Sequence, residues 1–495
     1  MLDLKQYEVW FVTGSQHLYG DDTLKQVDEH SQQIVNALNA SGKLPVRVVF
    51  KPVLTNQEAI TRLCLEANIA ENCIGLITWM HTFSPAKMWI NGLKRLQKPL
   101  VHLHTQFNRD IPWQEIDMDF MNLNQSAHGD REFGFIVTRL GIDRKVIVGH
   151  WQDPEVEQDL ADWMRAALGW HEMQNVKIAR FGDNMREVAV TEGNKVGSQV
   201  EFGFAVDGYG LGDLLAVLNQ VTDAEVEELL AVYDQEYQLM DSLKPGREYR
   251  GALAEQAKYE LAIERFLKQG GYTGFTTTFE NLHGLEQLPG LAVQRLMKKG
   301  YGFGAEGDWK TAALLRVMKV MATGLEGGTS FMEDYTYHLE PGNMRILGAH
   351  MLEVCETMAA DQPTLEVHPL SIGGKNDPVR SLFTAPPGPA VAVTLVDLGH
   401  RYRMIVNKVE VVESEELPKL PVARALWIPK PDLKTAAAAW ILAGGAHHTS
   451  FSQALTVQQM VDFAEIAGVE CMVIDESTDL NQFKKELRWN QAYYG

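Results

Sequence analysis

Short hydrophobic runs alternate with longer amphipathic stretches along the first third of the chain. Residues 23–40 place apolar side chains at the spacing of one helix face, and Ser84 followed by Pro85 is typical of a helix N-cap with proline in the first turn. Runs rich in apolar and β-branched residues predict strands at residues 8–12, 46–50, 74–79 and 100–104. Strands that alternate with helices in this way predict a parallel βαβ sheet.

The same alternation returns in the middle third. A strand is predicted at residues 176–181, and helices follow at 223–242 and 251–268. Residues 271–279 are rich in glycine and threonine and interrupt the helical pattern as a strand or loop. A last helix is predicted from 309 to 323, with Asp308 as its N-cap. This stretch predicts a second, mixed α/β unit.

After Gly327 and Gly328 the pattern changes to short β-branched runs separated by proline and glycine, such as 390–396 and 404–412. This change predicts a third, β-rich domain. The length of 495 residues agrees, because about 150 residues per domain also gives about three domains. We therefore predict an α/β protein with domains at 1–175, 176–325 and 326–495.

The composition predicts a water-soluble globular protein. Hydrophobic residues make up 45% of the chain and charged residues 22%, and no apolar stretch of ~20 residues exists that could cross a membrane. The first residues lack the basic segment, apolar run and cleavage site of a secretory signal, which predicts a cytoplasmic protein. The four cysteines form no CxxC pair, as is typical of reduced thiols.

The charge and the glycine loops exclude several classes of ligand. A formal net charge of −20 with scattered Lys and Arg argues against binding nucleic acid or anionic lipid. Neither GxGxxG nor GxxxxGK[ST] occurs, so nucleotide binding through a glycine loop is unsupported. Ligands bind beyond the carboxyl ends of strands in parallel sheets, which here are residues 13–20 and 81–83. We expect these two loops to form walls of a site.

Two acidic positions lie in settings that suit an ion or a ligand. Glu306 stands among three glycines just before a predicted helix, where the backbone could bring the carboxylate close to a ligand, although a solvated surface turn fits the same pattern. Glu333 and Asp334 interrupt an apolar and aromatic run, and a buried carboxylate there needs a partner or a metal. If the run is a strand, only one of these two acids faces inward.

Three histidines are candidates beside these acids. His350 lies in an apolar run, a setting that equally suits a hydrogen-bonded core histidine, and His338 and Glu353 are rival ligands nearby. His447 and His448 follow a stretch of small residues, and on an extended segment one of the two faces away. Carboxylates and imidazoles without thiolate suit Mn²⁺, Mg²⁺ or Co²⁺ better than structural zinc. No local motif such as HExxH links these residues, so spacing alone does not select among them.

Several runs resemble those of bacterial L-arabinose isomerases. They are FVTGSQHLYG at 11–20, GAEGDWK at 304–310 and GGAHHT at 444–449, and the resemblance covers nearly the whole chain, including MEDY at 332–335, GAHML at 348–352 and LRWN at 487–490. The resemblance implies N-terminal and central domains with Rossmann- or flavodoxin-like parallel sheets, followed by a β-rich, barrel-like C-terminal domain. It also implies conversion of L-arabinose to L-ribulose in arabinose catabolism, with D-galactose to D-tagatose as a related activity.

The resemblance further implies a set of site residues. It selects Glu306, Glu333, His350 and His448 as ligands of Mn²⁺, with Co²⁺ or Mg²⁺ as alternatives, and gives acid and base roles to Glu306 and Glu333. Family members are homo-oligomers, often hexamers, whose N-terminal loops complete a neighbour's site, so Gln16, Gln125 and His128 are expected to act in a neighbouring subunit. The implied sugar pocket is lined by Gln16, Phe83, Gln125, His128, Met185, Phe279, Tyr335 and Ile372.

Two other classes fit parts of the sequence. Tandem α/β units also occur in sugar-binding receptors, but those carry a secretory signal that this sequence lacks. A metal hydrolase could use the same four ligands to activate water. Only an isomerase would form a ketose from L-arabinose, so that product separates the three classes.

Overall fold

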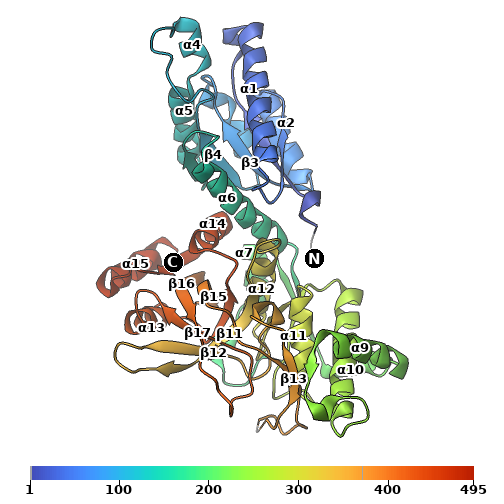
Figure 1. Cartoon of the computed structure of the whole chain (residues 1–495). Coiled ribbons are helices and arrows are strands. Elements are labelled where there is room, and N and C mark those ends of the chain that lie inside the picture. Colours follow the sequence, from blue (N-terminus) through green and yellow to red (C-terminus); the bar gives the residue numbers. More distant parts are fainter. Residues whose placement is uncertain (1–2, 371, 495) are drawn as a thin grey trace. The chain divides into compact units, whose positions relative to one another are not determined.

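The computed structural model describes residues 3–370 and 372–494, which form two compact units (Figure 1). One unit contains residues 3–171 together with 461–468, and the other contains residues 172–460 together with 469–494. Within the described residues, no helix is both long and apolar enough to cross a membrane. All four cysteines are free thiols, and three of them are buried.

The first unit is built on a five-stranded parallel sheet with strand order β2-β1-β3-β4-β5. All seven residues of its central strand β3 are buried, as expected of a parallel strand covered on both faces. The order reverses beside β1, and the loops after β1 and β3 therefore meet at one edge. Its strands are β1 (Glu8–Thr13), β2 (Arg47–Phe50), β3 (Cys73–Trp79), β4 (Leu100–His104) and β5 (Lys145–Val148).

Helices flank this sheet, and local sequence explains how they begin. Asp21 and Asp22 lie in the first turn of α1, where negative charge suits the helix dipole, and the Asn56 side chain caps α2. The helices are α1 (Asp21–Ala40), α2 (Gln57–Ile69), α3 (Ile90–Leu93), α4 (Met118–Leu123), α5 (Ser126–Arg139) and α6 (Pro154–Met173), the last of which continues to the second unit. Short 3₁₀ turns are η1 (Leu4–Gln6), η2 (His17–Tyr19) and η3 (Ala86–Met88).

The predicted N-cap at Ser84 is wrong. Pro85 has an extended backbone with ψ 120°, and only the 3₁₀ turn η3 follows it. The Ser84 hydroxyl accepts a hydrogen bond from the Trp89 indole at 2.9 Å instead of capping a helix. Tertiary packing of a buried tryptophan has replaced the local capping pattern.

The second unit begins with a four-stranded parallel sheet in the order β10-β9-β6-β7. The predicted α12 and its Asp308 cap are confirmed, since the Asp308 side chain accepts from the Thr311 amide. The strands are β6 (Lys177–Phe181), β7 (Ala205–Tyr209), β9 (Gly274–Thr276) and β10 (Gly302–Gly304). The helices are η4 (Ala189–Thr191), α7 (Lys195–Phe202), α8 (Leu211–Leu218), α9 (Asp223–Glu236), η5 (Asp241–Leu243), α10 (Arg250–Gly270), α11 (Gly290–Lys298) and α12 (Trp309–Met321).

The helix predicted at 223–242 ends earlier than its periodicity suggested. A capping box at Thr222 starts α9, but Tyr237 is extended with ψ 154° and ends it. The chain then enters the short strand β8 (Gln238–Leu239), which pairs with β13. Pairing with a strand more than 100 residues away decides this end, and local periodicity cannot detect it.

The remainder of this unit is a closed antiparallel β-barrel of six strands, in the order β15-β18-β11-β12-β17-β16, because β15 also pairs with β16. The fold class predicted from the sequence is confirmed. The barrel strands are β11 (Thr329–His338), β12 (Arg345–Ala349), β15 (Gly388–Asp397), β16 (Tyr402–Val412), β17 (Arg424–Pro429) and β18 (His448–Ser452), and β19 (Glu470–Ile474) adds in parallel to β16. A small sheet joins β8 to β13 (Thr364–Val367) and β14 (Val379–Leu382), and the helices are η6 (Glu356–Met358), α13 (Leu433–Leu442), α14 (Val457–Ala467) and α15 (Leu480–Tyr493).

The central sheet and part of the barrel share one hydrophobic core. A single buried cluster runs from Ala179 and Phe275 of the central sheet to Phe331 of β11 and Val379 of β14. Residues 172–460 therefore pack as one compact unit. The domain boundaries at 175/176 and 325/326 stay a prediction.

Candidate metal centre

Glu306 occupies a strained turn between β10 and α12. Its backbone is left-handed, with φ 58°, a conformation that L-residues with side chains rarely adopt and that clusters at functional sites. The next residue, Gly307, has φ 80°, and a Cβ there would lie 2.5 Å from the Asn184 Cα. The Glu306 carbonyl accepts a hydrogen bond from the Met185 amide at 3.0 Å. The fold thus holds the Glu306 backbone in this conformation despite the strain.

Glu333 lies on the barrel strand β11 and is paired on both sides. Its partner on β18 is His448 and its partner on β12 is Ala349, so His350 follows directly after the paired position. Directly opposed residues of antiparallel strands point to the same face. Strands β11 and β18 therefore bring Glu333 and His448 to one face, and His350, directly after β12, lies with its Nε2 3.9 Å from Glu333 Oε2. Figure 1 labels β11 and β12 in the second unit.

Each of these two histidines is held by a carboxylate on one ring nitrogen. His448 Nδ1 lies 3.1 Å from Asp308 Oδ2, and His350 Nδ1 lies 2.6 Å from Glu353 Oε2. A carboxylate only accepts hydrogen bonds, so Nδ1 carries the proton in each ring and Nε2 keeps its lone pair. Metal-binding histidines are commonly oriented by such a carboxylate.

The free Nε2 atoms face the two glutamates. His448 Nε2 lies 3.9 Å from Glu306 Oε2, His350 Nε2 lies 3.9 Å from Glu333 Oε2, and the two imidazole centroids are 5.9 Å apart. Ligands about 2.1 Å from one octahedral ion stand roughly 3 to 4 Å from each other. Each of the two histidine–glutamate pairs thus has a separation that neighbouring ligands of one divalent ion could have.

The His448 side chain supplies a direct test of that fit. It is fully buried, yet among the described residues its Nε2 has no hydrogen-bond partner. A buried polar atom without a partner is costly, and a metal ion would satisfy it. Two carboxylates and two imidazoles without a thiolate suit Mn²⁺, Co²⁺ or Mg²⁺. The residues present therefore fit a divalent metal ion.

His447 lies at the edge of the same site. Among the described residues, Glu306, His447 and His448 have one ligand atom each within 4.8 Å of one another. His447 Nε2 lies 3.3 Å from Glu306 Oε2, and the hydrogen bond with that carboxylate raises the His447 pKa. Its side chain is 36% exposed, whereas that of His448 is fully buried, yet both rings approach the same Glu306 oxygen. The prediction that one of the two neighbours faces away is therefore wrong, because β18 begins only at His448 and strand alternation does not govern His447.

Several acids around the site have shifted pKa values. Burial alone would raise the pKa of Asp308, but Lys310 and hydrogen bonds from His448 and Thr311 outweigh it and lower the value to about 2. Burial and repulsion from Glu333 raise the pKa of Asp334 to about 7. The Asp334 Oδ1 is also buried without a hydrogen-bond partner in the described part of the chain. Asp308 is thus ionised at neutral pH, whereas Asp334 is partly protonated.

Three of the residues expected to line the sugar pocket are in the same unit and close to these ligands. The Met185 amide contacts Glu306, the Phe279 ring stacks on the His350 imidazole at 6.1 Å and 11°, and Tyr335 follows Glu333 by two positions on β11. Burial and the Glu333 charge raise the pKa of the Tyr335 phenol. Ile372 is partly buried in the connection between β13 and β14.

The other four expected pocket residues lie in the first unit. Gln16 and Phe83 are on the two loops that were predicted to wall a site, whereas Gln125 is the N-cap of α5 and His128 lies in its first turn. The Phe83 and His128 rings are 4.7 Å apart, and the Tyr19 hydroxyl donates to Gln125 Oε1 at 3.4 Å. Gln16 precedes η2 in the loop after β1. An open depression of about 590 Å³ is lined by Phe83, Ala127, His128, Arg131 and Glu132.

Sequence reasoning missed the roles of two carboxylates. Asp308 was expected only as a helix cap and Glu353 only as a rival ligand, yet each bonds the Nδ1 of a histidine. Glu353 is three residues after His350, and this short spacing could have indicated from the sequence that the two side chains pair. Asp308 and His448 are 140 residues apart, and no local signal connects them.

Comparisons with known proteins agree with this architecture. Models of the L-arabinose isomerase N-terminal, central and C-terminal domains match residues 3–175, 177–324 and 328–470. The L-arabinose isomerase of Herpetosiphon aurantiacus is 64% identical over 495 residues, which are 100% of this chain and 99% of that protein. The L-arabinose isomerases of Geobacillus stearothermophilus and Bacillus subtilis are 63% and 58% identical, with the same coverage of 100% and 99%.

The fold and the site define an enzyme class in which parallel α/β sheets precede a closed barrel that carries histidine and carboxylate side chains able to hold a metal ion. Full-length matches at this identity then decide the family. The chain belongs to the L-arabinose isomerase family. The resemblance stated from the sequence and the identification as an isomerase are both confirmed.

Proposed function

We propose that this protein converts L-arabinose to L-ribulose, with D-galactose to D-tagatose as a second activity, at the site formed by Glu306, Glu333, His350 and His448. The observation that carries the proposal is the pair of carboxylate-held imidazoles whose free Nε2 atoms face two glutamates. Family membership supports the substrate.

The reaction moves one proton between adjacent sugar carbons. One of the two glutamates takes the C2 proton and the acid and base groups return a proton to C1, while the O2 proton passes to O1, so that aldose and ketose balance through an enediol. A divalent ion, when bound, supplies Lewis-acid polarisation of the carbonyl and stabilises the developing negative charge. Both glutamate side chains are about one-fifth exposed, which leaves each carboxylate accessible to a sugar.

The roles of the two glutamates can be tested directly. Solvent deuterium exchange at C2 of the sugar is measured by NMR in Glu306→Gln and Glu333→Gln. We expect exchange to fall in both and to be lost in the variant that lacks the C2 base, because an amide cannot accept that proton. Exchange at the wild-type rate in both variants would contradict the assignment.

The metal is proposed to be Mn²⁺, held by Glu306, Glu333, His350 and His448, with Co²⁺ or Mg²⁺ as alternatives. Ketose formation is measured after complete chelation and again after each ion is added back separately. We expect loss and recovery of activity with at least one of the three ions. Isomerisation that continues unchanged after complete metal removal would overturn the mechanism.

We also propose a homo-oligomer, most simply a hexamer, in which Gln16, Gln125 and His128 contribute to a neighbour's sugar pocket. The support is an exposed apolar segment in the first unit, residues 111–121, which presents Trp113 at 79% and Met118 at 66% exposure. Large exposed apolar surfaces of this kind mark contact sites for other chains. A cytoplasmic location is proposed because all four cysteines are free thiols.

A further inference from the structure

The segment that carries His350 and Glu353 lies between β12 and η6 and is buried without regular structure. No helix or strand covers residues 350–355, although Leu352, Val354 and Cys355 are at most 2% exposed. Buried backbone groups need hydrogen-bond partners. We call residues 350–358 the ligand segment, and its partners must come from other elements.

Buried side chains supply those partners. The Ser330 hydroxyl accepts from the Cys355 amide at 2.7 Å, and the Gln294 amide donates to the Val354 carbonyl at 3.0 Å. Arg380 Nη1 donates to the Met351 carbonyl at 3.3 Å. The ligand segment is therefore held by contacts from β11, α11 and β14 rather than by a ladder of its own.

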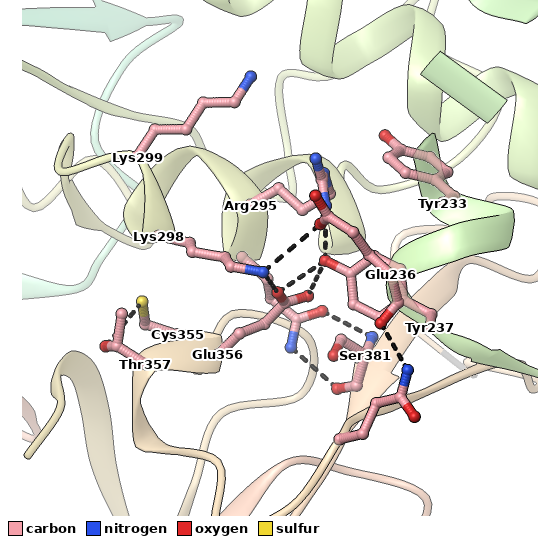
Figure 2. A network of polar contacts seen from close by, with 12 residues as sticks. Tyr233, Glu236, Tyr237, Arg295, Lys298, Lys299, Cys355, Glu356, Thr357 and Ser381 are labelled. Carbon is pink, nitrogen blue, oxygen red and sulfur yellow. Dashed lines mark hydrogen bonds and ion pairs between the residues drawn. The ribbon is translucent and has the colours of Figure 1, made fainter. Parts of the chain in front are cut away.

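The far end of the ligand segment is anchored through the Glu356 carboxylate, which is 1% exposed. The Tyr237 hydroxyl donates to Glu356 Oε2 at 2.6 Å, and Lys298 Nζ lies 3.2 Å from the same oxygen (Figure 2). Arg295 Nη1 in turn donates to the Tyr237 oxygen at 2.7 Å. Tyr237 thus connects a buried guanidinium to a buried carboxylate.

Arg295 is itself fixed by acids on two further helices. Its Nε lies 2.7 Å from Glu260 Oε2 of α10, and its Nη1 lies 2.8 Å from Glu236 Oε2 of α9. Opposite charges that surround a buried arginine restrict its position. Glu356 is consequently tied to a cluster of three packed helices, and Figure 2 shows Glu236, Tyr237, Arg295 and Lys298 around it.

We infer that Tyr237 and Lys298 are positioning residues that act through Glu356 to hold His350 and Glu353 in the geometry that binds the metal. This inference rests on the proposed metal site. Only a few residues separate His350 from Glu356, and His350 is fixed at its other side to strand β12. Hydrogen bonds to Met351, Val354 and Cys355 hold the middle of the ligand segment, and Glu356 holds its end, so loss of the Glu356 anchor loosens the segment beside Glu353. Shifts of about 1 Å are enough to impair a site.

The two buried tyrosines of this network offer a matched pair of variants. Tyr233 lies four residues before Tyr237 and is likewise buried. Its hydroxyl donates to Glu260 Oε2 at 2.6 Å, whereas the Tyr237 hydroxyl donates to Glu356. Tyr237→Phe and Tyr233→Phe each remove one buried hydroxyl from a carboxylate. Both are expected to lower the melting temperature, but only Tyr237→Phe releases the ligand segment.

Mn²⁺ titration calorimetry and hydrogen exchange measure how the Tyr237→Phe and Tyr233→Phe variants differ in metal affinity and in the stability of the ligand segment. We expect Tyr237→Phe to weaken Mn²⁺ binding by about threefold to tenfold, since one buried hydrogen bond is lost, and Tyr233→Phe to bind nearly as the wild type does. In the metal-free protein, peptides covering residues 350–358 should exchange faster in Tyr237→Phe only. Activity of Tyr237→Phe should recover at saturating Mn²⁺.

A second pair keeps the test informative if the tyrosine variants fold poorly. Lys298 pairs with Glu356, whereas its neighbour Lys299 pairs with Glu260 at 2.8 Å and Glu264 at 2.5 Å. Both lysines are partly exposed, so Lys298→Met and Lys299→Met are mild changes. Only Lys298→Met is expected to weaken Mn²⁺ binding, by about twofold to threefold.

Equal Mn²⁺ affinity and equal exchange of residues 350–358 within both matched pairs would overturn the inference. Failure of the proposed function would look different. In that case His350→Asn would bind Mn²⁺ as well as the wild type, whereas the exchange measurement on the metal-free protein would still decide whether Tyr237 and Lys298 hold the ligand segment.

Discussion

At the scale of single residues, the site depends on how each histidine is oriented rather than on which histidines are present. Asp308 combines two tasks, because its carboxylate caps α12 through the Thr311 amide and also accepts from His448 Nδ1. Its low pKa keeps it ionised, and an ionised group is the better acceptor. His448 Nε2 is thereby left as the free ligand atom.

Asp308→Asn should therefore weaken Mn²⁺ binding by about 10- to 100-fold, because a neutral amide accepts more weakly than an ionised carboxylate and orients the imidazole less firmly. Titration calorimetry measures the change. Asp432→Asn is the matched control, since Asp432 caps α13 and bonds Thr435 in the same way without contacting a histidine. A similar loss of affinity in both variants would mean that helix capping, not histidine orientation, is responsible.

The left-handed backbone of Glu306 lowers the unfolding free energy of the protein. Ala at φ 58° retains left-handed strain of roughly 1 to 2 kcal/mol, whereas Gly does not, although the greater freedom of Gly in the unfolded chain offsets part of the gain. We expect Glu306→Gly to exceed Glu306→Ala in unfolding free energy by about 0.5 to 1 kcal/mol, and both to be inactive. Urea unfolding measures this difference in the metal-free protein.

Glu187 provides the control for that comparison, because it is exposed and also has a left-handed backbone, with φ 65°. Glu187→Gly should exceed Glu187→Ala by a similar amount while both remain active. If Glu306→Gly were no more stable than Glu306→Ala, the strain at Glu306 would not be an energetic cost of the site.

At the scale of elements, β12 must lie close to β17 for His350 to reach the site. Gly348 permits this approach, since a Cβ there would overlap the Trp427 ring. Gly348→Ala should destabilise the protein by about 2 to 3 kcal/mol and weaken Mn²⁺ binding, because overpacking displaces the strand that precedes His350. Gly342→Ala, in the open β11–β12 turn with φ 82°, should cost only about 1 kcal/mol and leave Mn²⁺ binding unchanged.

Thermal unfolding and Mn²⁺ titration of these two glycine variants measure the predicted effects. If Gly348→Ala were destabilised but bound Mn²⁺ with unchanged affinity, the packing of β12 against Trp427 would not be needed to position His350. Wild-type stability in that variant would show that the Trp427 ring can move aside.

Local signals predicted many elements but not their long-range partners. The strands near residues 8–12 and 100–104 and helix α12 were predicted because hydrophobic spacing and the Asp308 cap are local properties. The end of α9 at Tyr237 depends on a strand distant in sequence, and the role of Ser84 depends on how the buried Trp89 packs, so both predictions were wrong. Closure of the barrel through β15 and β16 likewise depends on pairing that no single segment specifies.

For the candidate site too, local sequence and long-range packing determine different features. Alternation along an extended segment predicted that His447 or His448 faces away, but His447 precedes β18 and both imidazoles approach Glu306. The pairing of Asp308 with His448 was not predicted from the sequence, because it forms only when α12 and the barrel pack together. Residue chemistry made the four proposed ligands plausible, and family resemblance was needed to choose them.

At the scale of the whole molecule, the exposed apolar segment 111–121 is the strongest indication of a larger assembly. Trp113 and Met118 are exposed in the first unit, the unit that also carries Gln16, Gln125 and His128. Water contact with such side chains is unfavourable, and a second copy of the chain would cover them. Assembly and sugar binding are therefore expected to depend on the same unit.

The double substitution Trp113→Lys and Met118→Lys should produce smaller particles in light scattering, because two charges would have to be buried in the contact. Isomerase activity should fall with the particle size, while circular dichroism stays that of a folded protein. Ile441→Lys, at an equally exposed apolar position on α13 in the other unit, is the control and should keep both size and activity. Full activity in a verified monomer would refute shared active sites, since the pocket residues of the first unit would then have to serve their own chain.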